Sequence, residues 1–276
     1  MKIAVLSGKG GTGKTTVSSS LAFISKMLLI DTDIEEPNSH IFLKGNVEDI
    51  KSVYTRFPEV NMEKCNLCGE CGNFCKFNAI IPAKKRVIVF GEACHDCGGC
   101  EIVCKNGAIS WEQREIGKIF TGKTHFNSVN KYGKLNIGEM SGVKIIKEIY
   151  KNTEEKDFLI DCPPGTACTT VSAVEVADFA IIVVEPSPFG LSDMKLVVQL
   201  LRDMKIPFGV VINKFDEDEN IVKKYCEDEG IEVIGTIPFG RKIAETYSKG
   251  EIIAEALPEY RKNFETILKR VKSYGN

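Results

Sequence analysis

A cysteine pattern that occurs twice limits the folding of this chain more than any other feature of its sequence. The two copies lie 29 residues apart and share the spacing C-x2-C-x2-C-x3-C: Cys65, Cys68, Cys71 and Cys75, then Cys94, Cys97, Cys100 and Cys104. Eleven cysteines in 276 residues, most of them in these two runs, indicate metal ligation rather than disulfides. The repeat therefore predicts two pseudo-symmetric halves that fold around inorganic cofactors.

The repeat resembles the ligand pattern of bacterial-type ferredoxins, which hold two [4Fe–4S] clusters. In that family three closely spaced cysteines cap one cluster, and the fourth cysteine of the run is given to the other cluster. The resemblance implies two crossed ligand sets: Cys65, Cys68, Cys71 and Cys104 for one cluster, and Cys94, Cys97, Cys100 and Cys75 for the other. Lys76 and Lys105 stand where those ferredoxins usually have proline, and these cations are expected to raise the reduction potential. Two structural zinc sites are the alternative, although zinc-binding C-x2-C pairs usually lie about 12–20 residues apart.

Outside the cysteine region the sequence alternates between short apolar runs and helical patterns. The runs are typical of buried parallel strands and cover residues 3–6, 28–31, 158–161, 180–184, 209–213 and 232–234. The helical patterns cover residues 15–27, 143–150, 191–204 and 221–229. Repeated strand–helix units predict an α/β fold with a doubly wound, mainly parallel sheet. Because the alternation fails between about residues 57 and 111, we expect residues 1–57 and 112–276 to form one discontinuous domain, and residues 58–111 a small inserted ferredoxin-like α+β domain.

A glycine-rich loop follows the first predicted strand and opens the first predicted helix. It has the G-x4-G-K-[ST] pattern and comprises Gly8, Lys9, Gly10, Gly11, Thr12, Gly13, Lys14 and Thr15. Backbone N–H groups of such a loop wrap a polyphosphate, and the helix dipole adds positive potential. Lys14 is expected to reach the β- and γ-phosphates, the Thr15 hydroxyl to ligate Mg²⁺, and Thr16 to lie at the nucleotide. The loop therefore predicts a P-loop NTPase fold.

The additional lysine of this loop, Lys9, carries a family resemblance. The run K-G-G-x-G-K-T resembles the deviant Walker A motif of the MinD/ParA family of ATPases, which includes the nitrogenase iron protein. In that family the early lysine reaches the nucleotide of the partner subunit. The resemblance thus implies catalytic roles for Lys9 and Lys14, and a homodimer that forms on ATP binding. A solvated loop lysine is the alternative.

Two acidic strand ends resemble the switch segments of the same family. Asp33 follows the second predicted strand and looks like the switch I aspartate that orients the attacking water. Asp161 and Gly165 lie in a segment that resembles Walker B and switch II, where the carboxylate would hold Mg²⁺ and the glycine N–H would sense the γ-phosphate. A capping or solvated aspartate and a plain surface turn are the alternatives. Cys162 and Cys168 flank this turn and are expected to be small buried residues.

Asn213 ends the fifth predicted strand, at the position where the MinD/ParA family usually hydrogen-bonds adenine. The run N-K-F-D at residues 213–216 also fits the N-K-x-D guanine signature of GTPases, so GTP stays an alternative to ATP. The deviant lysine favours ATP.

Charge and hydropathy bear on partners and location. The formal net charge is −2, from 36 basic and 38 acidic side chains, and no basic patch for nucleic acid stands out. No apolar run approaches the roughly 20 residues that span a bilayer, and the N-terminus reads as a strand, so we expect a cytoplasmic protein. Residues 258–274 are basic and amphipathic, which favours a packed terminal helix over a membrane-binding one.

Three hypotheses about function follow from these features. In the first, ATP hydrolysis by a P-loop ATPase gates electron transfer from two clusters to a redox partner. In the second, the ATPase is a carrier that delivers an iron–sulfur cluster or metallocofactor to an acceptor protein. In the third, a positioning ATPase keeps the cysteine unit for structure alone. We place electron transfer first because the cysteines lie between Asp33 and Asp161, which joins them to both switch segments.

Overall fold

A single large sheet forms the centre of the molecule in the computed structural model, which describes residues 1–216 and 220–274. Within these residues nine strands pair in the order β11-β10-β9-β1-β8-β2-β7-β6-β3. The strands from β11 to β7 are mutually parallel, whereas β6 is antiparallel to β7 and β3 to β6. They are β1 (Lys2–Leu6), β2 (Leu28–Asp31), β3 (Asn46–Val60), β6 (Ile109–Lys123), β7 (Val129–Leu135), β8 (Phe158–Asp161), β9 (Phe179–Val184), β10 (Phe208–Phe215) and β11 (Val233–Pro238).

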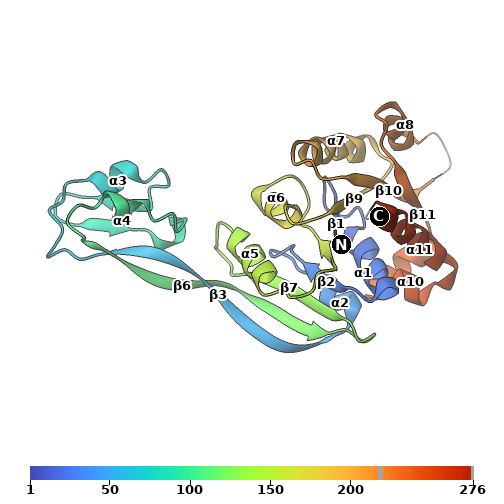
Figure 1. Ribbon diagram of the computed structural model, residues 1–276, viewed down its shortest axis with the longest axis horizontal. Coiled ribbons are helices and arrows are strands. Elements are labelled where there is room, and N and C mark those ends of the chain that lie inside the picture. Colours follow the sequence, from blue (N-terminus) through green and yellow to red (C-terminus); the bar gives the residue numbers. More distant parts are fainter. Residues whose placement is uncertain (217–219, 275–276) are drawn as a thin grey trace.

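Helices cover both faces of this sheet, so the hydrophobic core has two layers (Figure 1). Ile3 and Val5 of β1 face one layer, and Ala4 and Leu6 face the other, as the alternation of a strand requires. The first layer contains α1 (Lys14–Ser25), α2 (Ser39–Leu43), α9 (Arg241–Ser248), α10 (Ile253–Ala256) and α11 (Pro258–Ser273). The second contains α5 (Val143–Lys151), α6 (Cys168–Val174), α7 (Pro188–Asp203) and α8 (Ile221–Asp228). The predicted mainly parallel α/β sheet is confirmed.

The terminal helix α11 packs on the sheet through one apolar face. Phe264, Ile267, Leu268 and Val271 of this helix are buried in the first layer. The prediction of a packed terminal helix is therefore confirmed. None of the helices that the structure describes is long and apolar enough to cross a bilayer.

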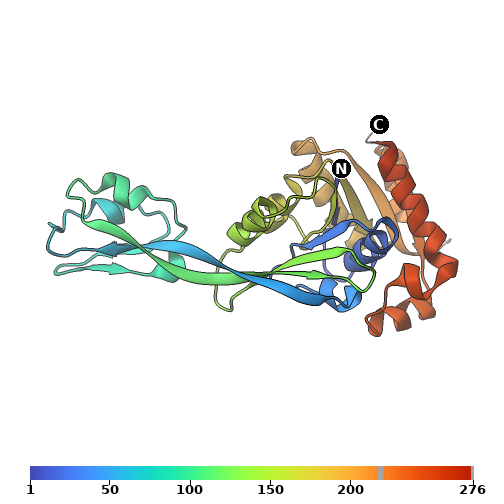
Figure 2. The same cartoon turned by 60° about the horizontal axis from the view of Figure 1, so that its bottom comes forward.

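The two strands at one edge of the sheet, β3 and β6, form a long arm (Figure 1). Each has 15 residues, and the two pair antiparallel over their whole length. Only residues 117–123 of β6 also pair with β7, so residues 54–60 and 109–116 continue as a free ribbon. Figure 2 shows the twist of this ribbon and the cysteine-rich unit at its outer end. The departure from strand–helix alternation thus begins at β3, earlier than the predicted residue 57.

The ribbon leaves the sheet at the carboxyl edge of the parallel strands. Gly117, the first residue of β6 that pairs with β7, lies opposite Leu135, the carboxyl end of β7. A register shift between Val53 and Tyr54 of β3 falls at the same place, and such bulges bend and twist a ribbon. At about 3.3 Å per residue, the free ribbon is roughly 23 Å long.

The unit at the end of the arm, the tip unit, consists of two similar halves. Each cysteine run contains a short helix that begins after a glycine with positive φ, 85° at Gly69 and 77° at Gly98. Ile80, Cys100 and Ile109 form a small core that is separate from both layers of the main sheet. The sequence repeat is therefore also a structural repeat. Its elements are α3 (Glu70–Phe74), α4 (Gly99–Val103), β4 (Ile80–Pro82), β5 (Val87–Val89) and a 3-10 turn (Gly91–Ala93).

Candidate functional site

The predicted nucleotide-site segments meet at the carboxyl edge of the parallel strands. The glycine-rich loop follows β1, Asp33 follows β2, Asp161 ends β8, and Asn213 lies near the end of β10. Because β1, β8 and β2 are neighbours in the sheet, the loop and both aspartates lie side by side. Open α/β sheets bind ligands at this edge.

Close packing fixes the shape of the glycine-rich loop. Gly13 has a φ of 97°, and a Cβ at this residue would lie 2.2 Å from Nδ2 of Asn213. That amide donates a hydrogen bond of 2.7 Å to the carbonyl oxygen of Thr12. On the other side, a Cβ at Gly8 would lie 2.4 Å from the backbone of Asp193 in α7. The loop therefore requires glycine at both positions, since a larger residue would displace β10 or α7.

Three aspartates at this edge share one buried region. Asp31 accepts N–H hydrogen bonds from Asp33 at 3.0 Å, Asn38 at 3.0 Å and Ser39 at 2.9 Å, which organises the segment after β2. Burial, aided by the charge of Asp31, raises the pKa of Asp33 to about 6 and that of Asp161 to about 7, while Lys14 opposes both shifts. Carboxyl groups with pKa values near neutrality are typical of functional sites.

Asp161 is suited to hold a cation. Its Oδ1 atom is buried and has no hydrogen-bond partner among the described residues. The hydroxyl groups of Thr15 and Ser18 face its carboxylate and lower its pKa. Carboxylate and hydroxyl oxygens are ligands that Mg²⁺ accepts, and a buried unpaired carboxylate oxygen is costly without a cation. The residues present therefore fit Mg²⁺.

The predicted switch II turn is hydrogen-bonded to its neighbours. Gly165, with a φ of 82°, donates its N–H to the carbonyl oxygen of Ser7 at 2.9 Å. Thr32 donates both its N–H and its hydroxyl to the carbonyl oxygen of Asp161, each at 2.9 Å. The N–H that was predicted to sense a phosphate is thus engaged by the end of β1 in this structure. Of the two flanking cysteines, Cys162 is buried as predicted, but Cys168 is exposed, so the prediction was wrong for Cys168.

Lys9 is held by a carboxylate of its own chain. It forms an ion pair with Glu185, which follows β9, and Glu185 also binds Nζ of Lys214 at 3.1 Å. The hydrogen bond from Lys9 is the main reason why the pKa of Glu185 lies below its usual value. Sequence reasoning missed Glu185, although an acidic residue directly after the apolar run of β9 marks the same sheet edge as Asp33.

A cavity of about 260 Å³ adjoins the glycine-rich loop on its β10 side. Gly13 and Thr16 contribute from the loop and α1, Asn213 from β10, and Ile243 and Tyr247 from α9. One N–H of the Asn213 side-chain amide donates to the carbonyl oxygen of Thr12. The other N–H and the oxygen of this amide can bind a ligand. The contribution of α9 was not predicted, because its residues match no motif.

The tip unit contains a second cavity, of about 550 Å³. Four cysteines line it, and they are the first of the two crossed sets: Cys65, Cys68, Cys71 and Cys104. In the other set, burial raises the pKa of the Cys94 thiol, and the neighbouring thiols of Cys97 and Cys75 raise it further. The structure thus brings the fourth cysteine of each run to the cysteines of the other run. Across residues 1–216 and 220–274, no three His, Cys, Asp or Glu side chains converge on one metal-ion position.

Known proteins resemble the chain along nearly its whole length. Residues 3–253 match the family of CobQ/CobB/MinD/ParA nucleotide binding domains. An uncharacterized protein of Methanocaldococcus jannaschii is 34% identical over 261 residues, which cover 91% of this chain and 90% of that protein. An iron-sulfur cluster carrier protein of Pyrococcus furiosus is 28% identical and covers 99% of this chain, with 88% of its own length matched. The solved structure of the septum site-determining protein MinD of Pyrococcus horikoshii, complexed with Mg-ADP, has a TM-score of 0.60 at 21% identity over 98% of this chain and 95% of its own.

Proposed function

This chain belongs to the CobQ/CobB/MinD/ParA family of nucleotide-binding domains and has the MinD-like P-loop fold, and from that premise we propose that it is an ATP-hydrolysing iron–sulfur protein. It holds two [4Fe–4S] clusters, and its nucleotide state controls when they serve a partner protein. The observation that carries the proposal is the cavity at the tip unit, whose four cysteines come from both runs. A unit of this kind on an arm that leaves the sheet at the same carboxyl edge as the phosphate loop joins cluster and nucleotide in one molecule.

The nucleotide part of the proposal uses the chain's own groups. Backbone N–H groups of residues 8–15 hold the phosphates, and Lys14 neutralises their charge. Asp161 and Thr15 hold Mg²⁺, which supplies charge neutralisation at the phosphates when it is bound. Asp33 orients the attacking water, and Asn213 contacts the base from the cavity beside the loop. In the switching step, the Gly165 N–H gives up its hydrogen bond to the Ser7 carbonyl oxygen and donates to the γ-phosphate instead.

We further propose that Lys9 completes the nucleotide site of a second copy of this chain. The support is its place in a K-G-G-x-G-K-T run and its half-buried position at the sheet edge. In the single chain it binds Glu185 instead of a phosphate. A homodimer formed with ATP therefore requires Lys9 to exchange Glu185 for the partner's nucleotide.

The cluster part of the proposal rests on the chemistry of the donors. Thiolates are the ligands of [4Fe–4S] clusters, and the two crossed sets supply four each: Cys65, Cys68, Cys71, Cys104, and Cys94, Cys97, Cys100, Cys75. Such clusters supply one-electron chemistry when they are bound. Because the thiols must stay reduced, we place the protein in the cytoplasm.

Two uses of the clusters are compatible with these sites. The name of the relative in Pyrococcus furiosus, an iron-sulfur cluster carrier protein, favours cluster delivery over the electron transfer that we placed first. The crossed cysteine sets favour electron transfer, because release of either cluster would free cysteines of both halves.

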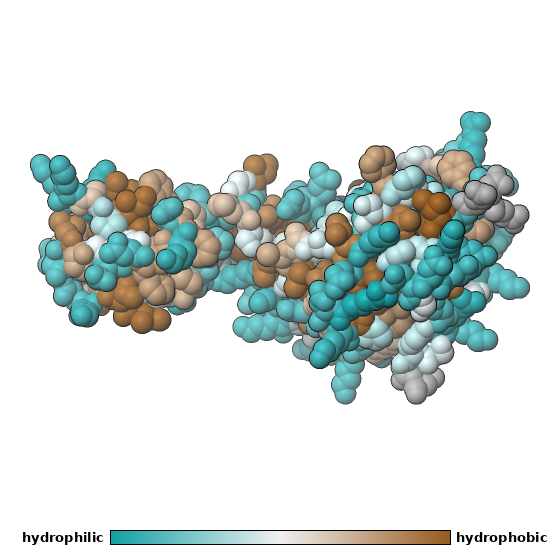
Figure 3. Space-filling view, turned by 90° about the horizontal axis from the view of Figure 1, so that it is seen from above, coloured by the Kyte–Doolittle hydropathy of each residue, from teal (hydrophilic) through white to brown (hydrophobic). Residues whose placement is uncertain are grey.

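Either use needs a protein partner at the tip unit. Figure 3 shows apolar side chains gathered on that unit, where Phe74, Phe77, Phe90 and Ile102 are exposed.

One experiment tests the proposal and separates the two uses. The chain is loaded anaerobically with ⁵⁷Fe clusters, and its iron content and ATP hydrolysis are measured together. We expect about eight iron atoms per chain and hydrolysis that is lost in Lys14→Ala. Transfer of ⁵⁷Fe to an apo-ferredoxin that depends on ATP supports delivery. Reduction of an oxidised ferredoxin by the chemically pre-reduced chain, with full retention of ⁵⁷Fe, supports electron transfer. A chain that takes up neither iron nor nucleotide would contradict both.

A further inference from the structure

The two halves of the tip unit carry different residues at one equivalent position, and only one of these two residues faces the main body. Between the first two cysteines of each run, the equivalent residues are Leu67 and Asp96, and both have a positive φ, 57° and 53°. Leu67 lines the cavity of the first cysteine set, which contains no residue of the main body. Asp96 instead lines a cavity of about 340 Å³ that lies between the tip unit and the start of α5. The repeat is therefore asymmetric where it meets the nucleotide-binding body.

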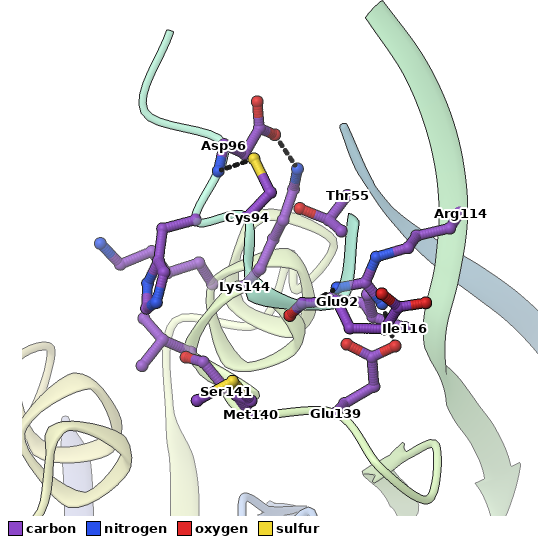
Figure 4. Close-up of a pocket in the computed structure, with 13 residues that line it drawn as sticks. Thr55, Glu92, Cys94, Asp96, Arg114, Ile116, Glu139, Met140, Ser141 and Lys144 are labelled. Atoms are coloured by element: carbon purple, nitrogen blue, oxygen red, sulfur yellow. Dashed lines mark hydrogen bonds and ion pairs between the residues drawn. The ribbon is translucent and has the colours of Figure 1, made fainter. Parts of the chain in front are cut away.

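Asp96 binds the second cysteine loop to both the arm and the body. Its carboxylate accepts a hydrogen bond of 2.8 Å from Nζ of Lys144 in α5, and one of 2.9 Å from Nε of Arg56 in β3. Its own N–H points to Sγ of Cys94 at 3.5 Å. Figure 4 shows Lys144 reaching from the helix to the carboxylate and Cys94 directly beside it. A second ion pair, between Arg114 and Glu139, crosses the same cavity.

The helix that carries Lys144 leads to the nucleotide site. Ile145, Ile146 and Ile149 of α5 are fully buried, so the helix moves with the core rather than independently of it. The hydroxyl of Tyr150 donates a hydrogen bond of 2.6 Å to the carbonyl oxygen of Ala173 in α6. The switch II turn directly precedes α6, and β8, which ends in the Mg²⁺-site aspartate, directly follows α5 in the chain. A continuous set of contacts therefore joins that turn to α5, and a movement of the turn can be transmitted along it.

From this asymmetry we propose that the Asp96–Lys144 ion pair transmits the nucleotide state to one cluster only, the cluster held by Cys94, Cys97, Cys100 and Cys75. This inference rests on the proposed function, since it requires both clusters and a bound nucleotide. The reduction potential of a cluster depends on nearby charge and on hydrogen bonds to its sulfurs. A shift of Lys144 changes the charge beside this cysteine loop and the placement of the Asp96 N–H at Cys94. The other cluster lacks such a contact among the described residues.

The test is a redox titration of the full chain with both clusters, followed by electron paramagnetic resonance. It is carried out without nucleotide, with Mg-ADP, and with a non-hydrolysable Mg-ATP analogue. The variants Cys65→Ser and Cys94→Ser assign each signal to its ligand set. We expect the potential of the Cys94 set to change between the nucleotide states and that of the Cys65 set to stay constant. We expect Lys144→Gln to lose this change and Lys144→Arg to keep it.

Lys147→Gln is the matched control, because Lys147 lines the same cavity from the same helix but forms no ion pair among the described residues. Nucleotide binding is measured for every variant, to show that each one still binds both nucleotides at the concentrations used, since Lys144 lies outside the phosphate site. Equal shifts of both clusters, no shift of either, or a full shift in Lys144→Gln would overturn the inference and leave the proposed function intact. A wild-type chain that binds no cluster or no nucleotide would overturn both.

Discussion

The buried carboxyl groups at the ends of β2 and β8 make the stability of the nucleotide-free chain sensitive to pH. Asp161 has a pKa of about 7 and Asp33 of about 6 in the folded chain, against 3.8 for an ordinary aspartate. Between about pH 4 and pH 7 these two groups thus bind more protons in the folded chain than in the unfolded chain. Stability then falls as pH rises through this window, because a raised acid pKa favours folding only while the group is protonated.

We predict that the nucleotide-free chain loses roughly 1–3 kcal/mol of unfolding free energy between pH 5 and pH 8. Mg-ATP should reduce this loss, since Mg²⁺ compensates the charge of Asp161. Asp161→Asn should remove most of the pH dependence and also weaken Mg²⁺ binding. Urea unfolding at the two pH values, with and without Mg²⁺ and nucleotide, measures both effects. An equal pH dependence in Asp161→Asn would contradict the assignment.

The ion pair of Lys9 with Glu185 should oppose dimer formation. We predict that Glu185→Gln lowers the ATP concentration at which the dimer forms by about fivefold, since a partly exposed ion pair contributes roughly 1 kcal/mol. Sedimentation of the chain at increasing ATP concentration measures this. The control is the same substitution in a Lys9→Ala chain, where it should have no effect. If Glu185→Gln acts equally there, its effect comes from Lys214 and not from Lys9.

The crossing of the cysteine runs can be tested one ligand at a time. Cys104→Ser should destroy the cluster of Cys65, Cys68 and Cys71, although Cys104 belongs to the second run. Cys75→Ser should destroy the other cluster, so each variant keeps about half of the iron. The electron paramagnetic resonance spectrum of Cys104→Ser should then resemble that of Cys65→Ser, and the spectrum of Cys75→Ser should resemble that of Cys94→Ser. The reverse correspondence would show that each run holds its own cluster.

At the scale of elements, the contact between α5 and α6 should contribute measurably to stability. Tyr150 packs against the core and donates its hydroxyl proton to the Ala173 carbonyl oxygen, and burial raises the pKa of the phenol well above its usual value. We predict that Tyr150→Phe lowers the free energy of unfolding by about 1–2 kcal/mol. Tyr54→Phe, on the exposed arm, is the control and should change it by less than about 0.5 kcal/mol. Chemical denaturation of both variants tests this.

Elements with a buried face were predictable, and those without one were not. Three apolar residues followed by an aspartate sufficed to place β2 at residues 28–31, because a strand buried on both faces is a continuous apolar run. In contrast, β3 has charged residues such as Asp49, Lys51 and Arg56 along its exposed edge, so neither a period of two nor an apolar run marks it. The predicted strand at residues 232–234 extends to Pro238 as β11.

The same distinction applies to the sites. Motif spacing indicated the phosphate loop, both aspartates and the cysteine sets, because their chemistry fixes the sequence locally. Glu185, Tyr247 and Lys144 were missed, since each acts through a contact with residues far away in the chain. Only the folded structure brings such pairs together.

At the scale of the whole molecule, the arm should be removable. Tyr54 and Glu115 are paired neighbours at its base, and Ile116, which packs in the core, lies just beyond them. We predict that a chain with residues 55–114 replaced by an Asn-Gly turn folds and binds Mg-ATP within about twofold of the full chain. It should take up no iron. Calorimetry with ATP and iron analysis check both points, and loss of nucleotide binding would show that the arm is part of the nucleotide-binding fold.

The point at which the ribbon leaves the sheet also has a mechanical consequence. A stiff rod that is hinged at one end magnifies rotation, and a turn of about 5° at the base of a ribbon roughly 23 Å long moves its far end by roughly 2 Å. The base of the ribbon lies at the carboxyl edge of the parallel strands, the same edge as the phosphate loop. A small rotation at this base therefore produces a larger displacement of the tip unit. The bond from Asp96 to Lys144 lies beside Arg56, two residues from the base of the ribbon. A small displacement of Lys144 at that point would therefore become a larger displacement at the far end of the arm.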